Sequence, residues 1–89
     1  MEPEFKILTH LSDNYLHLKL IGRFNSVSAR KLVDLMRRYV GKVPIVIIHT
    51  NSLVRDVQFA MDEFRHDLLL LREQPVQFIV TGEHASLFN

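Results

Sequence analysis

The chain has 89 residues, 47% of them hydrophobic, which is enough for one small folded domain spanning residues 1–89. The 11 basic and 10 acidic residues leave a net charge of +1, which argues against a dedicated nucleic-acid-binding protein, and the absence of cysteine excludes disulfides and thiolate chemistry. The first residues carry no basic segment followed by an apolar run, and no apolar run is long enough to cross a bilayer, so we expect a cytoplasmic protein without a membrane span.

Two alternating segments open the chain, at residues 5–11 and 15–21, and a polar turn separates them. If residues 13 and 14 form the turn, Leu11 lies opposite Leu16 on an apolar face, and His10 lies opposite His17 on a mixed face. This pattern predicts a hairpin covered on one side. Two histidines are an incomplete zinc set, so we expect no metal and no cofactor, and solvated strand residues are the simpler interpretation.

The first helix is predicted to begin near Asn25 or Ser26, either of which is a suitable N-cap. Apolar residues recur at helical spacing from Ala29 to Val40. Gly41 follows them, where a helix of this kind ends.

The central strand is predicted at residues 45–48, which are four consecutive β-branched apolar residues. An apolar run without alternation is typical of a strand in the middle of a sheet, covered on both faces, so Val46 or Ile47 should be fully buried. Residues 49–52 are polar and are predicted to form a loop. In open α/β sheets, functional sites tend to lie at such a carboxyl end.

The second helix is predicted from about residue 56 to residue 72, with Asp56 as its N-cap and Pro75 preventing its continuation. Phe59, Leu69 and Leu70 lie off its main apolar stripe. These residues suggest a self-association surface and a homodimer. The alternative is that they are ordinary exposed apolar residues.

The last strand is predicted at residues 76–81, and Gly82 follows it. The expected fold is α/β, with a four-stranded mixed sheet made of an N-terminal hairpin and then parallel strands. Because parallel crossovers are right-handed, the helices should lie mainly on one face of the sheet.

Four segments of the chain resemble the STAS domain, the fold of bacterial anti-sigma-factor antagonists. Residues 16–24, which end in Gly22-Arg23-Phe24, resemble its second strand, and residues 28–32 resemble the start of its first helix. Residues 44–50 and 76–82 stand where the family has its central strand and the next strand. The resemblance implies a non-catalytic regulatory role in signalling, with a protein partner such as an anti-sigma factor or a kinase-like protein.

Family members that are switched by phosphorylation carry Asp-Ser-Ser-Gly or Asp-Ser-Thr-Gly at the start of the second helix. This chain has Arg-Asp-Val-Gln at residues 55–58, so Asp56 stands at the aspartate position while the acceptor serine and the glycine are missing. Ser52 is the nearest hydroxyl and is the candidate phosphoacceptor.

The partner-binding surface is predicted at Asn51, Ser52, Arg55 and Asp56, because a buried strand holds this segment and a helix begins there. The alternative interpretation is that Asn51 and Ser52 only turn the chain and that Asp56 only caps the helix.

A different class of function stays open, in which the chain is a small-ligand-binding or enzymatic domain that uses the segments holding His49, Gly82 and His84. A pocket on which His49 and His84 converge would favour this class. The sequence contains no Gly-x-Ser-x-Gly motif and assembles no catalytic set, so we expect a protein that is not an enzyme.

Overall fold

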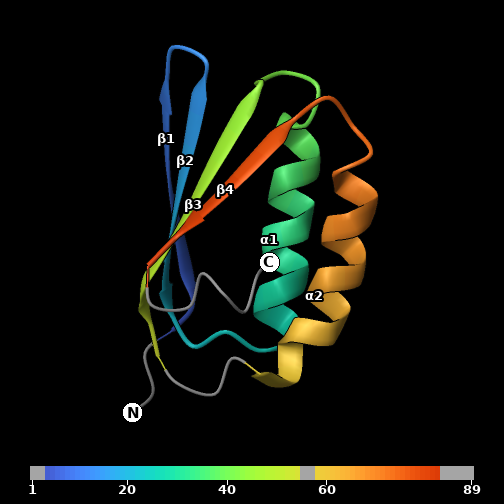
Figure 1. Cartoon of the computed structure of the whole chain (residues 1–89). Helices are drawn as coiled ribbons and strands as arrows, with labels where there is room; N and C mark the ends of the chain where they lie inside the picture. Colours follow the sequence, from blue (N-terminus) through green and yellow to red (C-terminus); the bar gives the residue numbers. More distant parts are fainter. Residues whose placement is uncertain (1–3, 55–57, 83–89) are drawn as a thin grey trace.

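The order of elements follows the expected α/β pattern (Figure 1). A computed structural model describes residues 4–54 and 58–82, with the backbone alone for residues 58–63. Its helices and strands are β1 (Lys6–Ser12), β2 (Tyr15–Gly22), α1 (Ser26–Tyr39), β3 (Ile45–Leu53), α2 (Gln58–Leu71) and β4 (Gln77–Thr81). No helix in the described part of the chain is both long and apolar enough to cross a membrane.

The four strands form one mixed sheet in the order β1-β2-β3-β4. β1 and β2 are antiparallel, whereas β2, β3 and β4 run parallel to one another. Both helices pack on the same face of the sheet (Figure 1). The expected fold class and the expected placement of the helices are therefore confirmed.

The hairpin adopts the predicted register, with Leu11 opposite Leu16 and His10 opposite His17. Asp13 has a positive φ of 51°, as a tight hairpin turn requires. The face assignment of Leu11 predicts burial, but its side chain is 56% exposed. The tip of the hairpin extends beyond the helices in Figure 1, which accounts for this exposure.

Helix α1 begins as predicted, because the Asn25 side chain accepts a hydrogen bond of 3.0 Å from the backbone N–H of Ser28. The Ser28 hydroxyl donates to the Arg23 carbonyl at 2.7 Å and ties the helix start to the end of β2. The helix ends before Gly41, whose φ of 87° suits a residue without a Cβ.

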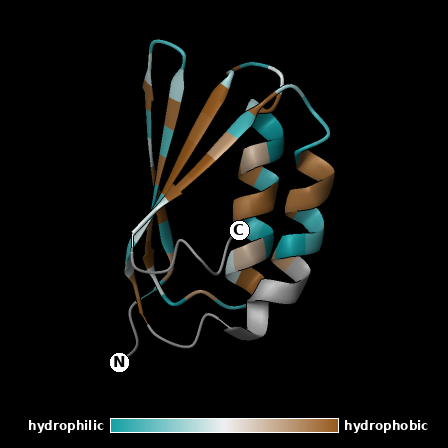
Figure 2. Cartoon of the chain, viewed as in Figure 1, coloured by the Kyte–Doolittle hydropathy of each residue, from teal (hydrophilic) through white to brown (hydrophobic). Residues whose placement is uncertain are grey.

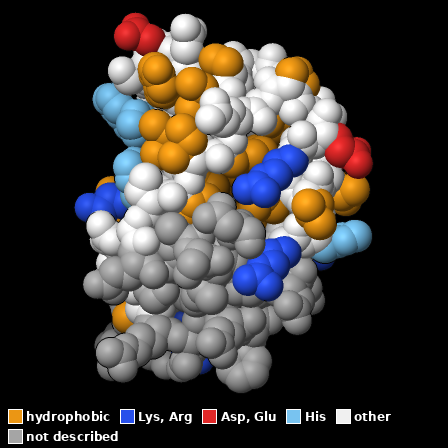
Figure 3. All heavy atoms as spheres, in the orientation of Figure 1, with side chains coloured by type: hydrophobic (Ala, Val, Ile, Leu, Met, Phe, Trp, Pro, Cys, Tyr) orange, Lys and Arg blue, Asp and Glu red, His pale blue; other side chains and the backbone are white. Residues whose placement is uncertain are grey.

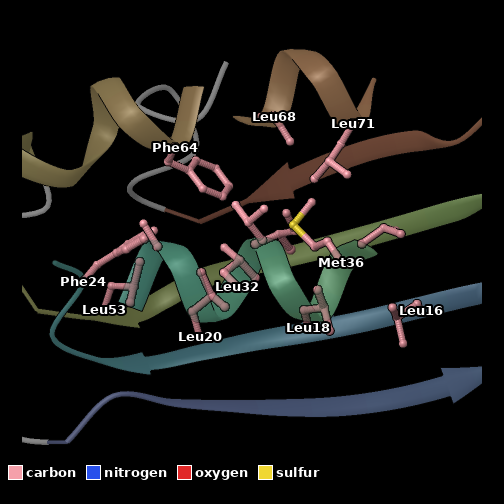
Figure 4. Close-up of a cluster of buried hydrophobic side chains, with 14 of the residues drawn as sticks. Leu16, Leu18, Leu20, Phe24, Leu32, Met36, Leu53, Phe64, Leu68 and Leu71 are labelled. Carbon is pink, nitrogen blue, oxygen red and sulfur yellow. The ribbon is translucent and has the colours of Figure 1, made fainter. Parts of the chain in front are cut away.

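The core lies between the sheet and the two helices. Figure 4 shows side chains of α1 and α2 meeting those of β2. Phe64 of α2 packs edge-on against Phe24, with ring centroids 5.6 Å apart. The fully buried apolar side chains are Leu16, Leu18, Leu20, Phe24, Leu32, Met36, Val46, Ile48 and Phe64.

β3 lies in the middle of the sheet as predicted, and Val46 and Ile48 are fully buried beneath the helices. Figure 2 shows the run of hydrophobic residues along the first half of this strand. Ile45 and Ile47 point to the other side and are only half-buried. The expectation that β3 is covered on both faces is therefore wrong for the described residues, because both helices pack on one side.

The side of the sheet opposite the helices is called the open face below. The strand pairing places on it, among other side chains, Lys6, Leu8, His17, Lys19, Ile21, Ile45, Ile47, His49, Ser52, Ile79 and Thr81.

Helix α2 ends at Leu71, one residue before the predicted end at residue 72. Strand β4 begins at Gln77, one residue after the predicted start at residue 76. The predicted N-cap, Asp56, lies outside the described residues.

Candidate functional site

The polar residues after Ile48 belong to β3, which continues to Leu53. The prediction of a loop at residues 49–52 is wrong because pairing with β2 continues beyond a bulge, with Ile21 beside Ser52 and Gly22 beside Leu53. Leu53 is buried, and the backbone N–H of Val54 donates to the Gly22 carbonyl at 2.9 Å. The strand is longer than its polar composition suggests because apolar Leu53 anchors its end in the core.

A polar cluster crosses three strands on the open face. His17 Nδ1 of β2 lies 3.2 Å from His49 Nε2 of β3, and His49 Nδ1 lies 2.9 Å from Thr81 Oγ1 of β4. The two imidazole rings are nearly parallel, with an interplanar angle of 3°. Each hydrogen bond needs one donor and one acceptor, so the cluster accommodates a neutral His49 in either tautomer.

Burial lowers the pKa of His49 below its ordinary value, and repulsion from the charges of His17 and Lys19 lowers it further. The neutral imidazole is therefore favoured on this face. A neutral imidazole can accept a proton or a hydrogen bond, which gives His49 the chemistry of a weak base.

His10 extends this row of histidines, since its ring centroid lies 6.0 Å from that of His17. The cross-strand pairing of His10 with His17 is as predicted. The contact between His17 and His49 was not predicted from the sequence. In the described residues, no group of three or more His, Cys, Asp or Glu side chains is arranged to hold a metal ion.

Thr50 has a structural role on the side of the sheet that faces the helices. Its side chain is fully buried, and its hydroxyl donates to the Thr81 carbonyl at 2.7 Å. Gly82 has a φ of 104°, and a Cβ built there would lie 2.6 Å from Thr50 Oγ1 and 2.6 Å from Asn51 Oδ1. The ends of β3 and β4 are thus in close contact, which Gly82 permits because it has no side chain.

Two of the four predicted partner-binding residues are in the described part of the chain, and both are exposed. Asn51 and Ser52 lie between buried Thr50 and buried Leu53. Arg55 and Asp56 lie outside the described residues.

The residues of the alternative site are only partly brought together. Gly82 lies against the residues that follow His49 in β3, whereas His84 lies outside the described residues, so its convergence with His49 stays a prediction.

Of the predicted self-association residues, Leu69 is 63% exposed and Leu70 is 47% exposed on α2. The Phe59 side chain lies outside the described part of the structure.

The comparisons with known proteins identify no family for this chain. No model of a known protein family matches it, and no curated protein is significantly similar to it. The resemblance to the STAS domain therefore stays a prediction.

Proposed function

We propose that the chain is a non-catalytic regulatory module that docks a protein partner at the carboxyl end of β3. The docking surface consists of Asn51, Ser52 and Val54 and is called the exit surface below. Arg55 and Asp56 follow directly in the sequence and extend it.

The observation that carries this proposal is the exposure of two successive polar side chains, Asn51 and Ser52, on a strand whose backbone is held on both sides. The Thr50 hydroxyl ties it to β4, and the Val54 amide ties it to the end of β2. A surface that is rigid before binding loses little conformational entropy when a partner docks. Recognition residues are often found on segments that a rigid scaffold positions in this way.

The chemistry of the exit surface suits regulation by charge. A phosphate on Ser52 would add a charge of about −1.5 to −2. Val54 is 39% exposed and adds an apolar contact beside the polar pair. A charge change next to an apolar contact alters docking without changing the core.

The partner class comes from the resemblance to the STAS domain, which implies an anti-sigma factor or a kinase-like protein. The α/β fold agrees with that resemblance, but a fold by itself does not specify function. The identity of the partner therefore has to come from a binding experiment.

The test is a pulldown from the native host with the wild-type chain and the variants Ser52→Asp and Arg55→Ala. We expect both variants to change the recovery of the same partner by on the order of tenfold, which corresponds to about 1.4 kcal/mol. Ser12→Asp is the matched control, because Ser12 is exposed at the far end of the hairpin. Identical partner lists for all four proteins, at unchanged melting temperatures, would exclude the exit surface.

A small-ligand-binding function is the second candidate, and the hydrogen bonds from His17 to His49 and from His49 to Thr81 favour it. Both ring nitrogens of His49 already have partners in His17 and Thr81, so a small ligand would bind the imidazole by displacing one of these contacts. The discriminating measurement is a small-molecule screen that follows the His49 ring signals by NMR. Compounds that shift His49, with no effect of Ser52→Asp on any protein partner, would favour this function.

A further inference from the structure

The open face is unusual for strands of this kind. All-parallel sheets are almost always covered on both faces, and their strands are nearly continuous apolar runs. β3 has such a run at residues 45–48, and β2, β3 and β4 are parallel. Within the described residues, helices cover one face only. Ile45 and Ile47 are therefore apolar side chains in a position where a second layer would bury them.

We infer that the open face docks an amphipathic helix of a partner protein, with acidic residues flanking the apolar side of that helix. A helix is the expected occupant, because α1 and α2 already cover the opposite face and helices form both outer layers in sheets of this class. The apolar patch of the open face consists of Ile45 and Ile47 of β3 and Ile79 of β4, and Leu8 of β1 lies apart from it on the far side of Lys19. Leu8 is 52% exposed and Ile79 is 37% exposed, so apolar area is available for burial.

The charges of the open face indicate which type of residue should flank the apolar side of the partner helix. Lys6 and Lys19 are exposed on this face, and none of the four strands contains an aspartate or a glutamate. Glu4 and Asp13 lie only at the two ends of the hairpin. An imidazole is neutral or positive and never negative, so His17 and the other histidines do not offset the lysines.

Histidine side chains lie along the left-hand edge in Figure 3, on the sheet side of the molecule seen in Figure 1, with a basic side chain below them. Acidic residues on the partner would complement this distribution of charge.

Charge also argues against a second copy of this chain as the occupant. In a two-fold symmetric pair the same surface meets itself, so Lys6 and Lys19 would face a surface whose strands carry no carboxylate. Single-stranded nucleic acid is disfavoured because it binds on basic grooves lined with stacking aromatic residues. The apolar patch formed by β3 and β4 on this face is aliphatic, and the chain has a net charge of only +1.

The test uses NMR spectra of the full chain titrated with three probes. The first is a synthetic helical peptide with leucine along one side and glutamate on both flanks, and the second carries lysine in place of glutamate. The third is oligo-dT. We expect the acidic peptide alone to shift the amide signals of Ile47 and Ile79 at concentrations up to about 1 mM. The shifts should weaken in high salt, because the charged flanks are solvent-exposed.

Two double variants with equal charge changes separate the open face from the rest of the molecule. Lys6→Glu with Lys19→Glu should weaken peptide binding at least about tenfold. Arg30→Glu with Lys31→Glu makes the same change on exposed residues of α1 and should leave binding unchanged. The inference is overturned if the lysine peptide binds equally well, if shifts map to α1 or α2, if oligo-dT binds instead, or if no probe binds. The pulldown follows a native partner and the titration follows the Ile47 and Ile79 amides with synthetic peptides, so this inference and the proposed function can fail separately.

Discussion

His17 and His49 face one another across β2 and β3, with His17 Nδ1 3.2 Å from His49 Nε2. A hydrogen bond between two imidazole nitrogens requires that one of them accept, so at most one of the two rings carries a positive charge while the contact lasts. The protonation of these two histidines therefore determines whether this contact between β2 and β3 can form.

Burial, and after it the charges of His17 and Lys19, lowers the pKa of His49, which predicts a pH dependence of stability. The pKa of His49 is lowered in the folded state, so the unfolded chain binds more protons as the pH falls. The stabilisation is fully present above the unfolded pKa of about 6.5, and it is lost as the pH falls from there through the folded pKa. The free energy of unfolding, measured by urea denaturation between pH 7.5 and pH 5, should therefore fall more steeply for the wild type than for His49→Gln. Parallel curves for the two proteins would contradict this role of His49.

The hairpin register could be predicted from the sequence because a two-residue turn aligns its flanking strands. With Asp13 at a positive φ in the turn, His10 has to lie opposite His17. The register of β2 against β3 has no such local determinant, because α1 connects the two strands. His17 lies beside Ile47, and in this register its ring lies within hydrogen-bonding distance of His49, two residues further along β3.

The end of β3 was harder to predict than its start. Polar residues at 49–52 predict a loop when only the local sequence is considered. The structure continues the strand because Leu53 is buried in the core and Gly22 of β2 pairs with it. Tertiary packing thus outweighs local propensity at this position. Asn51 and Ser52 are exposed as expected, but on a strand and not in a flexible turn.

Two neighbouring isoleucines in β3 test the one-sided covering of the sheet. Ile48 is fully buried beneath the helices, whereas Ile47 is half-buried on the open face. Ile48→Ala should lower the free energy of unfolding by about 2–5 kcal/mol, because it removes buried atoms and leaves a cavity. Ile47→Ala should cost less than half of that. The measurement is the free energy of unfolding of the two variants by urea denaturation. Equal losses of this free energy would mean that both faces of the sheet are covered in the free protein.

The exposed leucines of α2 predict self-association. Leu69 and Leu70 together offer apolar area that a small domain leaves in water. The wild type should sediment as a dimer at micromolar concentration, and Leu69→Ser with Leu70→Ser should sediment as a monomer. Val27→Ser is the control, because Val27 is 65% exposed on α1 and its loss should not change the assembly. A wild-type chain that is monomeric at high micromolar concentration would rule out this surface.

A comparison of alanine substitutions at Gly41 and Gly82 distinguishes the energetic cost of backbone strain from that of a steric clash. Both have positive φ, at 87° and 104°, but a Cβ at Gly41 would meet nothing within 4 Å. Gly41→Ala should therefore cost only the penalty for a left-handed residue, about 1–2 kcal/mol. A Cβ at Gly82 would also lie 2.9 Å from the backbone nitrogen of Asn51, which cannot rotate away as a side chain can.

Gly82→Ala should consequently cost more than Gly41→Ala in urea denaturation. It should also shift the amide signals of Asn51 and Ser52, since β3 has to move away from β4 to make room for the added methyl group. Because the Thr50 hydroxyl donates to the Thr81 carbonyl, the same movement should weaken the hydrogen bond that holds the exit surface in place. Gly82→Ala is thus expected to reduce partner recovery in the pulldown, while Gly41→Ala keeps it. If the two variants lose equal stability and leave the spectra at residues 51 and 52 unchanged, the close contact between Gly82 and β3 does not position the exit surface.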